Sequence, residues 1–271
     1  MKDRLIVLFA ACSIAIGSFA ESQTKEPFKI FQFPANKIPC IDGNTADWDI
    51  VPDSFVIGSK LFRDYNGKYT DAPKPDNLDI QIKVGWVKGM NKLYFLYEGY
   101  DNYWDFSRLG RIADIFELMV DADLSGGPFV SALHPLKNVG GAETYYSFHG
   151  VHAQNYHIFT PPAPGKDWAI LWGSQYFLKS LPYSNAAYSY RFMPGKSGKL
   201  ILEFMITPFD YVGPEGPERA VESKLYTDKR IGLCWAVIDY DDVQSEKEDA
   251  FWSLSVQKNM YGDASSLNVF R

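Results

Sequence analysis

The sequence predicts an all-β protein, an antiparallel β-sandwich of about ten or more strands with long inserted loops. Short runs rich in β-branched and aromatic residues recur along the chain, and several alternate between polar and apolar positions. Clusters of Gly, Pro, Asn and Asp separate these runs, and almost no segment has helical periodicity. Strands at this spacing, without helices between them, are typical of sheets packed face to face.

The N-terminal segment is predicted to be a secretory signal peptide that is not part of the fold. Two basic residues precede an apolar run over residues 5–16, and Ser18-Phe19-Ala20 provides a small-x-small cleavage site. The run is shorter than the ~20 residues that cross a bilayer, and no later segment is long and apolar enough. We therefore expect removal of residues 1–20 and a secreted protein, periplasmic or extracellular. Lipid attachment at Cys12 is the less favoured alternative.

The strands are predicted in chain order. Residues 21–37 are expected to be an N-terminal leader with a first strand, and residues 38–271 a single sandwich domain. Residues 78–87 and 92–100 alternate with period two around a Lys-Gly-Met-Asn turn, which predicts a hairpin. A third strand is predicted over 112–121. Further strands are expected over 144–148, 155–159, 168–172, 187–193, 199–206, 231–239 and 250–255.

Turn residues define the remaining connections. The sequence Pro194-Gly195-Lys196-Ser197-Gly198 joins two of the predicted strands into a second hairpin. Residues 60–77 and 213–229 are polar and contain Pro and Gly, so they are interpreted as long loops within one domain.

The net charge and the composition of the chain limit which classes of molecule it is expected to bind. The chain of 271 residues has 27 Lys and Arg against 33 Asp and Glu, a net charge of -6. Nucleic-acid binding needs a dense basic surface, so this class is not expected. The 7 Trp, 17 Tyr and 19 Phe exceed what a core of this size requires, so some rings are expected to be exposed. The oligomeric state is left open.

Two cysteines remain after signal cleavage, Cys40 and Cys234, each in a segment interpreted as a strand. A disulfide would close a very long loop and is possible in an oxidising compartment. Two buried free thiols are an equal alternative. The chain contains no CxxC or CxxCH motif, which argues against a redox dithiol and a c-type haem attachment.

Short motifs also follow one another in a fixed order along the chain. They are Ile41-Asp42-Gly43, Ala46-Asp47-Trp48, Val84-Gly85-Trp86, Leu93-Tyr94-Phe95 leading to Asp101, Asp114-Ile115-Phe116-Glu117-Leu118 leading to Asp121, Ile231-Gly232-Leu233, Asp239-Tyr240-Asp241-Asp242 and Phe251-Trp252. This series resembles the carbohydrate-binding modules of family 9 over most of residues 38–256. The resemblance implies a β-sandwich that binds sugars, often beside or within carbohydrate-degrading enzymes, and sometimes with structural calcium. Residues 133–182 are longer than the family pattern.

Proteins recognise sugars with an aromatic ring that packs against the C–H face of the sugar and with polar side chains that hydrogen-bond to its hydroxyls. Residues of these two types are therefore the candidate ligand-binding residues. Trp104 fits, because Asp101 and Asn102 accompany it in a polar loop. A Trp packed over the sandwich rim is the competing interpretation. Further candidates are Trp168, Trp172, Tyr176, His149, His152 and His157, although core packing competes for the first three. We expect Trp104 and at least one of Trp168 and Trp172 to contact an oligo- or polysaccharide.

Acidic turns are candidate calcium ligands, because Ca²⁺ takes six to eight oxygen atoms. One group is Asp121 and Asp123, and the other is Asp239, Asp241 and Asp242. Solvated turn carboxylates are the alternative for each. Asp114 and Glu117 have opposite parity on their predicted strand, so at most one of them is expected to point inward.

Two further functions are kept open. A glycan hydrolase needs two suitably spaced carboxyl groups, which a sequence cannot show, and the chain has no GxSxG, HExxH, GxxxxGK or GxGxxG motif. The three histidines at positions 149, 152 and 157 lie close together in the sequence, so a metal-binding or haem-binding site is kept as an alternative. The predicted function is non-catalytic carbohydrate binding, accessory to polysaccharide breakdown.

Overall fold

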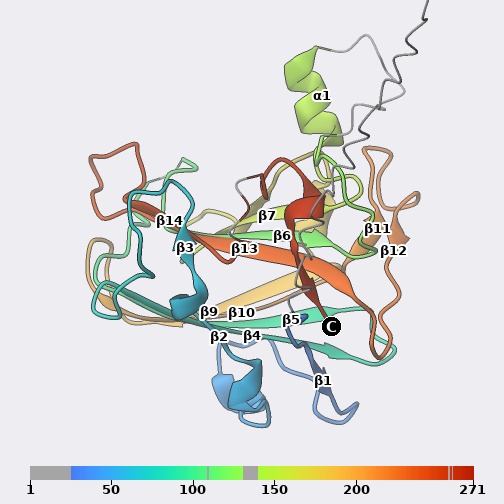
Figure 1. Cartoon of the computed structure of the whole chain (residues 1–271), viewed down its shortest axis with the longest axis horizontal. Coiled ribbons are helices and arrows are strands. Elements are labelled where there is room, and N and C mark those ends of the chain that lie inside the picture. Colours follow the sequence, from blue (N-terminus) through green and yellow to red (C-terminus); the bar gives the residue numbers. More distant parts are fainter. Residues whose placement is uncertain (1–25, 109, 131–139, 256, 258) are drawn as a thin grey trace, which may run out of the picture.

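The computed structural model describes residues 26–108, 110–130, 140–255, 257 and 259–271 (Figure 1). Its strands form two large sheets that face each other, with a helix and several long loops beyond the upper sheet in the view shown. The expected signal peptide and Cys12 lie outside the described residues. No helix within these ranges has the length and apolar character needed to cross a membrane.

One sheet has six strands in the order β1-β4-β5-β10-β9, with β2 paired to β4. They are β1 (Phe31–Phe33), β2 (Ile57–Gly58), β4 (Leu78–Val87), β5 (Leu93–Asp101), β9 (Ser184–Tyr190) and β10 (Gly198–Ile206). Both predicted hairpins are confirmed, because β4 pairs with β5 and β9 with β10 in antiparallel register. The β1–β4 pair is parallel, whereas the other strand pairs among the described residues are antiparallel. An isolated bridge between Phe28 and Phe270 is also parallel.

The other sheet has seven strands in the order β3-β14-β13-β6-β7-β8, with β15 paired to β13. They are β3 (Arg63–Asp64), β6 (Ile115–Asp121), β7 (Gln154–Phe159), β8 (Ala169–Leu171), β13 (Ile231–Asp239), β14 (Ala250–Ser253) and β15 (Asn268–Phe270). A small third sheet pairs β11 (Phe209–Tyr211) with β12 (Val221–Glu222). Short 3-10 segments cover Thr45–Trp48, Asp53–Phe55, Ser59–Leu61, Tyr176–Lys179 and Ala264–Ser266.

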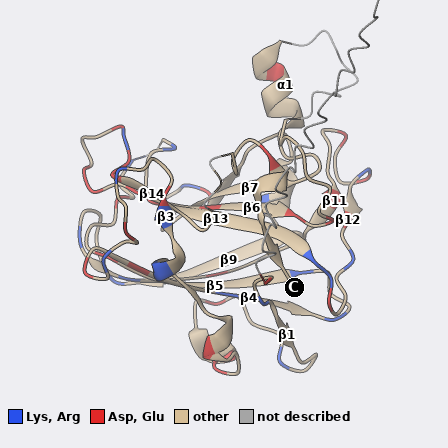
Figure 2. Ribbon diagram, in the orientation of Figure 1, with Lys and Arg blue, Asp and Glu red and all other residues tan. Residues whose placement is uncertain are grey.

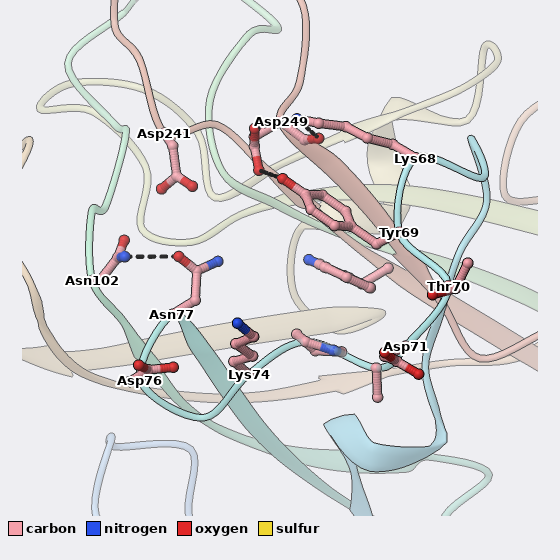
Figure 3. A pocket seen from close by; sticks show the side chains of 13 residues that line it. Lys68, Tyr69, Thr70, Asp71, Lys74, Asp76, Asn77, Asn102, Asp241 and Asp249 are labelled. Atoms are coloured by element: carbon pink, nitrogen blue, oxygen red, sulfur yellow. Dashed lines mark hydrogen bonds and ion pairs between the residues drawn. The ribbon is translucent and has the colours of Figure 1, made fainter.

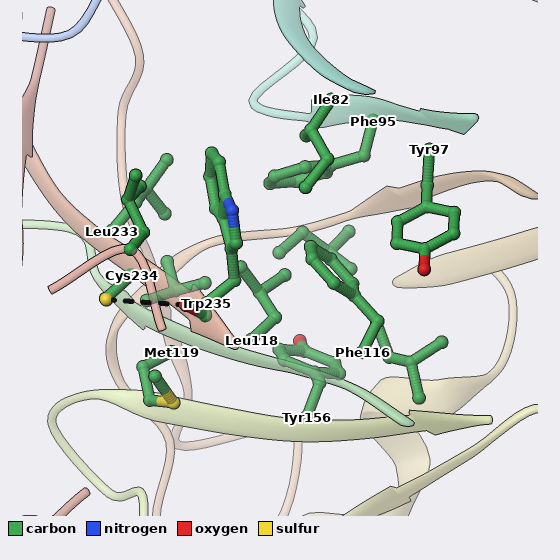
Figure 4. Packing of buried hydrophobic residues seen from close by; sticks show 14 of the residues in the cluster. Ile82, Phe95, Tyr97, Phe116, Leu118, Met119, Tyr156, Leu233, Cys234 and Trp235 are labelled. Atoms are coloured by element: carbon green, nitrogen blue, oxygen red, sulfur yellow. Dashed lines mark hydrogen bonds between the residues drawn. The ribbon is translucent and has the colours of Figure 1, made fainter. Parts of the chain in front are cut away.

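The core lies between the two large sheets and is strongly aromatic (Figure 4). Phe95 of β5 and Phe204 of β10 stack at 4.6 Å, and Phe116 of β6 approaches them from the opposite sheet. Trp235 of β13 packs against the same ring at 6.0 Å. These rings remove large apolar areas from water, which supplies most of the stabilisation of a sandwich.

A prediction of secondary structure is wrong at residues 144–148. The structure forms the helix α1 (Gly141–Phe148) here, where a strand was predicted. The helix contributes one buried residue, Phe148, and presents Tyr145 and Tyr146 outward. Aromatic residues favour strands only where a neighbouring strand pairs with them, and this segment has none.

The motifs between residues 41 and 48 anchor the segment after β1 to the six-stranded sheet. The Glu203 side chain on β10 accepts hydrogen bonds from the Trp48 indole at 2.8 Å and the Gly43 backbone N–H at 2.7 Å. Gly43 has a φ of +82° and approaches the backbone of Tyr188 closely, which requires a residue without a side chain. This part of the family resemblance therefore has a structural role.

Cys40 and Cys234 are both free thiols, so the disulfide alternative is wrong. Cys40 is exposed in the loop after β1, whereas Cys234 is buried in β13 of the other sheet. The expectation of two buried thiols holds for Cys234 alone.

Candidate functional site

A group of polar side chains lies on the outer face of the seven-stranded sheet, away from the core between the sheets. Phe116 and Leu118 of β6 point into that core, so Glu117 between them points to the other face. In the β6–β7 register Glu117 lies opposite His157. Asn155 occupies the same face two residues earlier on β7. Strand alternation and antiparallel pairing thus bring these three side chains together.

Glu117 is the centre of this group, which we call the Glu117 cluster and define as Glu117, Asn155, His157 and Trp172. The Glu117 carboxylate accepts hydrogen bonds from Asn155 Nδ2 at 2.7 Å and Trp172 Nε1 at 2.8 Å. Its other oxygen lies 2.6 Å from His157 Nδ1. A carboxylate that is 4% exposed needs such donors to offset its desolvation.

His157 bridges the cluster to the loop before β6. Its Nε2 lies 3.2 Å from the backbone oxygen of Arg111, which can only accept a hydrogen bond. The exposed Arg111 guanidinium lies over the Trp172 ring at 5.3 Å, and Trp172 is partly exposed. The rim of the cluster reaches solvent at these two side chains.

Several polar atoms beside the cluster have no hydrogen-bond partner among the described residues. His149 Nε2 lies 3.3 Å from Asn155 Oδ1, but its Nδ1 is unpaired. The Tyr261 hydroxyl is also buried and unpaired, and burial, with a smaller contribution from the charge of Glu117, raises its pKa well above the usual value. Burial lowers the pKa of His149, which favours the neutral ring. These atoms can donate to and accept from a ligand that bears hydroxyls.

The structure separates the aromatic candidates from one another. Trp172 belongs to the Glu117 cluster, whereas Trp168 packs against the core and donates its indole N–H to the Lys179 backbone oxygen at 2.8 Å. Tyr176 is 59% exposed in a 3-10 segment. Trp104 is 0% exposed, stacked on Phe192 at 5.2 Å, so its ring has no free face for a sugar. Its burial favours the competing interpretation of a Trp packed over the sandwich rim.

The histidine candidates also divide. His149 and His157 join or adjoin the Glu117 cluster, but His152 is partly buried and its Nε2 lacks a partner among the described residues. Asn102 bonds to Asn77 away from the cluster. Within the described ranges, the groups of side chains that could hold a metal ion contain only aspartates, and no histidine belongs to one.

Buried aspartates form two groups that share Asp239. In one, oxygens of Asp101, Asp114 and Asp239 lie within 4.8 Å of one another, and all three side chains are buried. The other joins Asp239 to Asp241 and Asp249. One oxygen of Asp239 has no hydrogen-bond partner among the described residues. The structure thus contains carboxylate groups that could hold a metal.

Burial governs the ionisation of these acids. Desolvation raises the pKa of Asp101 to about 8, with a further contribution from Asp241. The pKa values of Asp114 and Asp239 are raised well above the usual value, first by burial and then by the neighbouring carboxylates. Close carboxylates of this kind must share protons or bind a cation.

The other predicted calcium ligands lie outside these groups. One Asp121 oxygen accepts a hydrogen bond from the Gly126 backbone N–H at 2.9 Å, and the other lies 3.2 Å from the Ser125 nitrogen. Asp123 also accepts from Ser125. Asp242 is exposed and accepts from the Gln244 backbone N–H. Backbone amides therefore satisfy oxygens of these three aspartates within their own turns.

The expectation that at most one of Asp114 and Glu117 points inward is confirmed, because Glu117 lies on the outer face of β6. Asp114 has the opposite parity and lies beside Asp101 and Asp239. Both side chains are nevertheless buried, with Asp114 1% and Glu117 4% exposed. Sequence analysis also missed Asn155, Arg111 and Tyr261. The only signal in the sequence was that a buried Glu117 carboxylate needs hydrogen-bond donors. The sequence did not indicate which residues supply them.

Comparisons with known proteins bear on the fold. No protein-family model and no curated protein sequence matches the chain. Among solved structures, a family 9 carbohydrate-binding module from Caldicellulosiruptor kristjanssonii in complex with glucose is similar, with a TM-score of 0.56 and 13% identity over 91% of this chain and 95% of that one. The structure of a module of the same family and organism with cellotriose gives a TM-score of 0.55 and 13% identity, over 90% and 92%. The chain therefore has the β-sandwich fold of family 9 carbohydrate-binding modules, as its motifs implied.

Proposed function

We propose that the protein binds carbohydrate without catalysis, at the Glu117 cluster. The observation that carries this proposal is the convergence of a partly exposed Trp172 with Glu117, Asn155 and His157 from two adjacent strands. Sugar hydroxyls both donate and accept hydrogen bonds, and this cluster offers both kinds of group beside an aromatic wall. The unpaired His149 Nδ1 supports a ligand that supplies further polar atoms.

The class of sugar is inferred from charge and fold. The cluster contains one carboxylate, and the Arg111 guanidinium at its rim offsets that charge locally, so no net charge selects for a charged ligand. Solved modules of similar fold hold glucose and cellotriose. A neutral, glucose-type saccharide is therefore the proposed ligand. We further propose that the protein acts outside the cytoplasm as an accessory to polysaccharide breakdown, in keeping with the signal sequence expected over residues 1–20.

Calcium is proposed as a structural ion at the buried aspartates. Calcium fits this place because it prefers hard oxygen ligands, and Asp101, Asp114 and Asp239 provide carboxylate oxygens close together. Asp241 and Asp249 adjoin this group through Asp239. One oxygen of Asp239 is buried and unpaired among the described residues, so it is available to a cation. Bound calcium would neutralise carboxylates that link β5, β6 and β13, and would thereby stabilise one end of the sandwich.

Trp172→Ala tests the location of the carbohydrate site. Loss of the indole wall should weaken binding of cellotriose by about 1 to 3 kcal/mol, by analogy with the loss of a stacking ring in other aromatic sites. Isothermal titration calorimetry gives the affinity, and a thermal melt reports folding. Glu117→Gln should weaken binding as well, because the amide replaces one acceptor oxygen by a donor.

The matched control is Trp168→Phe, which removes an indole from the same part of the chain but outside the cluster. This variant should bind cellotriose like the native protein. Trp104→Phe, at the buried rim, should lower the melting temperature more than the affinity. Native-like affinity of a folded Trp172→Ala protein would show that the Glu117 cluster is not the site.

A further inference from the structure

A cavity lies at the end of the sandwich where β14 begins, outside the Glu117 cluster. It has a volume of about 600 Å³ and is lined by the loop over residues 68–77, Asn102, and the segment that contains Asp241 and Asp249 (Figure 3). In Figure 2 the loops at this end carry both acidic and basic positions. The motif residues Asp241 and Trp252 and the predicted ligand-binding residue Asn102 line this cavity, but the proposed carbohydrate site does not include it.

One wall of the cavity is an aromatic surface formed by the Tyr69 ring, which we call the aromatic shelf. Neighbouring side chains and backbone groups fix its position. Tyr69 stacks on Trp252 at 5.3 Å with 23° between the rings, and its hydroxyl donates to Asp249 at 2.9 Å. The buried Asp64 accepts hydrogen bonds from the backbone N–H groups of Lys68 and Tyr69 at 2.6 and 3.1 Å, which shapes the loop. Tyr69 remains 39% exposed, so part of its ring is free to contact a ligand.

Polar groups with unused hydrogen-bonding capacity face this shelf (Figure 3). One Asp241 oxygen is buried and has no partner in the part of the chain that the structure describes. Lys74 has no ion pair there either. Asn77 accepts a hydrogen bond from Asn102 at 2.7 Å, which leaves its own amide donors toward the cavity. Free donors and a free acceptor therefore lie beside an aromatic ring.

We propose that this cavity is a second carbohydrate-binding site, in which a neutral saccharide packs against Tyr69 and its hydroxyls bond to Lys74, Asn77 and Asp241. A saccharide matches this set because each hydroxyl can both donate and accept. Four carboxylates and two ammonium groups line the cavity, so a uronic acid would be repelled. The inference shares only its class of ligand with the proposed function, and two sites on one chain would raise the avidity for a polysaccharide.

The two sites can be followed separately, because each contains one tryptophan. The Trp172 indole N–H donates to Glu117, and the Trp252 indole N–H lies 3.4 Å from Asp239 beneath Tyr69. Their ¹⁵N–¹H signals are assigned by the peak lost in Trp172→Phe and in Trp252→Phe. The mature protein is then titrated to 100 mM with glucose, mannose, galactose, xylose and N-acetylglucosamine, and with galacturonic acid as the charged probe.

A saturable shift of the Trp252 signal with at least one neutral sugar, and none with galacturonic acid, is the expected result. Lys74→Ala should weaken this response about tenfold, as for loss of a charged hydrogen bond, and leave Trp172 unaffected. Lys60→Ala, which replaces an exposed lysine in the 3-10 segment Ser59–Leu61 outside the cavity, should change neither signal.

The same titration separates failure of this inference from failure of the proposed function. A response at Trp172 without one at Trp252 overturns the second site and leaves the first in place. A response at Trp252 alone supports the second site and removes the first. If neither indole signal shifts with any neutral sugar, both proposals are overturned. If the Trp252 signal shifts with galacturonic acid alone, the proposal that this site binds a neutral saccharide is overturned.

Discussion

Individual carboxyl groups at one end of the sandwich are unusual because they are buried next to one another. Asp101, Asp114 and Asp239 come from three strands or their ends, and backbone N–H groups satisfy only part of their oxygens. Burial disfavours the charged form, and each neighbouring carboxylate disfavours it further. The protonation of these residues must therefore depend on whether a cation is present.

This dependence predicts how stability responds to pH. The pKa of Asp101 is about 8 in the folded protein against 3.8 as its reference value, so between these limits the folded state holds a proton that the unfolded state releases. The stability that Asp101 contributes to the metal-free protein is therefore fully present below about pH 4 and should fall toward pH 8, by about 1.4 kcal/mol per pH unit for one proton. Urea unfolding in chelator at several pH values measures this slope.

Two controls accompany that experiment. Asp101→Asn should flatten the slope, because the amide cannot titrate but still accepts the Tyr103 N–H bond that Asp101 receives at 3.0 Å. Added Ca²⁺ should raise the stability more at pH 8 than at pH 5, since the ion displaces protons. A metal-free slope that is flat between pH 5 and 8, or a stability unchanged by millimolar Ca²⁺, would contradict the proposed roles of these aspartates.

At the scale of elements, the parallel edge strand β1 depends on a close approach to β4. Phe31 of β1 lies opposite Gly85 of β4, and a Cβ added to Gly85 would lie 2.2 Å from a ring carbon of Phe33. The Phe33 ring is buried with its edge against Trp48 at 5.2 Å. The ring cannot move aside without disturbing the second apolar cluster, which covers the outer face of this sheet.

Gly85→Ala is therefore expected to destabilise the protein by about 1 to 3 kcal/mol, the usual cost of overpacking. Gly58→Ala in β2 is the matched control, because its nearest neighbour is a backbone oxygen of Ile80 at 3.7 Å. Both changes alter the unfolded chain in the same way, so their difference isolates the contact. Equal urea midpoints for the two variants would show that β1 tolerates the extra methyl group.

Elements also differ in how well the sequence predicted them. The strands β4, β5, β10 and β13 were predicted to within a residue of their observed bounds, because each alternates or carries long apolar runs bounded by turns. Helix α1 was predicted as a strand, since its Thr, Tyr and Phe residues have high strand propensity. Its eight residues bury only Phe148, so the apolar pattern that identifies a helix was absent.

For the molecule as a whole, the positions of the two thiols test the arrangement of the sheets. Cys234 is buried in β13, and burial raises its pKa to about 12, so it should not react while the sandwich is folded. Cys40 is exposed, although the charge of Asp42 raises its pKa. Iodoacetamide at pH 8 should modify Cys40 in the native protein and Cys234 only in denaturant, as peptide mass spectrometry would show.

The melting temperature should accordingly be the same with and without a reductant, since no bond between the two thiols contributes to stability. A peptide in which Cys40 is linked to Cys234 would show that the sheets are arranged differently.

The local pattern of the sequence was enough to predict the class of fold, most of the strands and both hairpins. The alternation of polar and apolar residues within a strand involves only residues that are close in sequence. A strand can therefore be predicted without knowing which strand it pairs with. The carbohydrate-binding candidates His149, His157 and Trp172 were found in this way, as residues of a suitable type in an unusually aromatic segment.

Only the tertiary structure decided which of these residues meet. Glu117 bonds to His157 and Trp172 across 40 and 55 residues of sequence, through a strand register that no local pattern specifies. Glu117 is buried although it lies on the outer face of β6, away from the core between the sheets, and alternation alone could not predict this burial. The aspartate groups and the cavity beside Tyr69 likewise exist only because distant segments converge at one end of the sandwich, where burial and mutual repulsion give their carboxylates new properties.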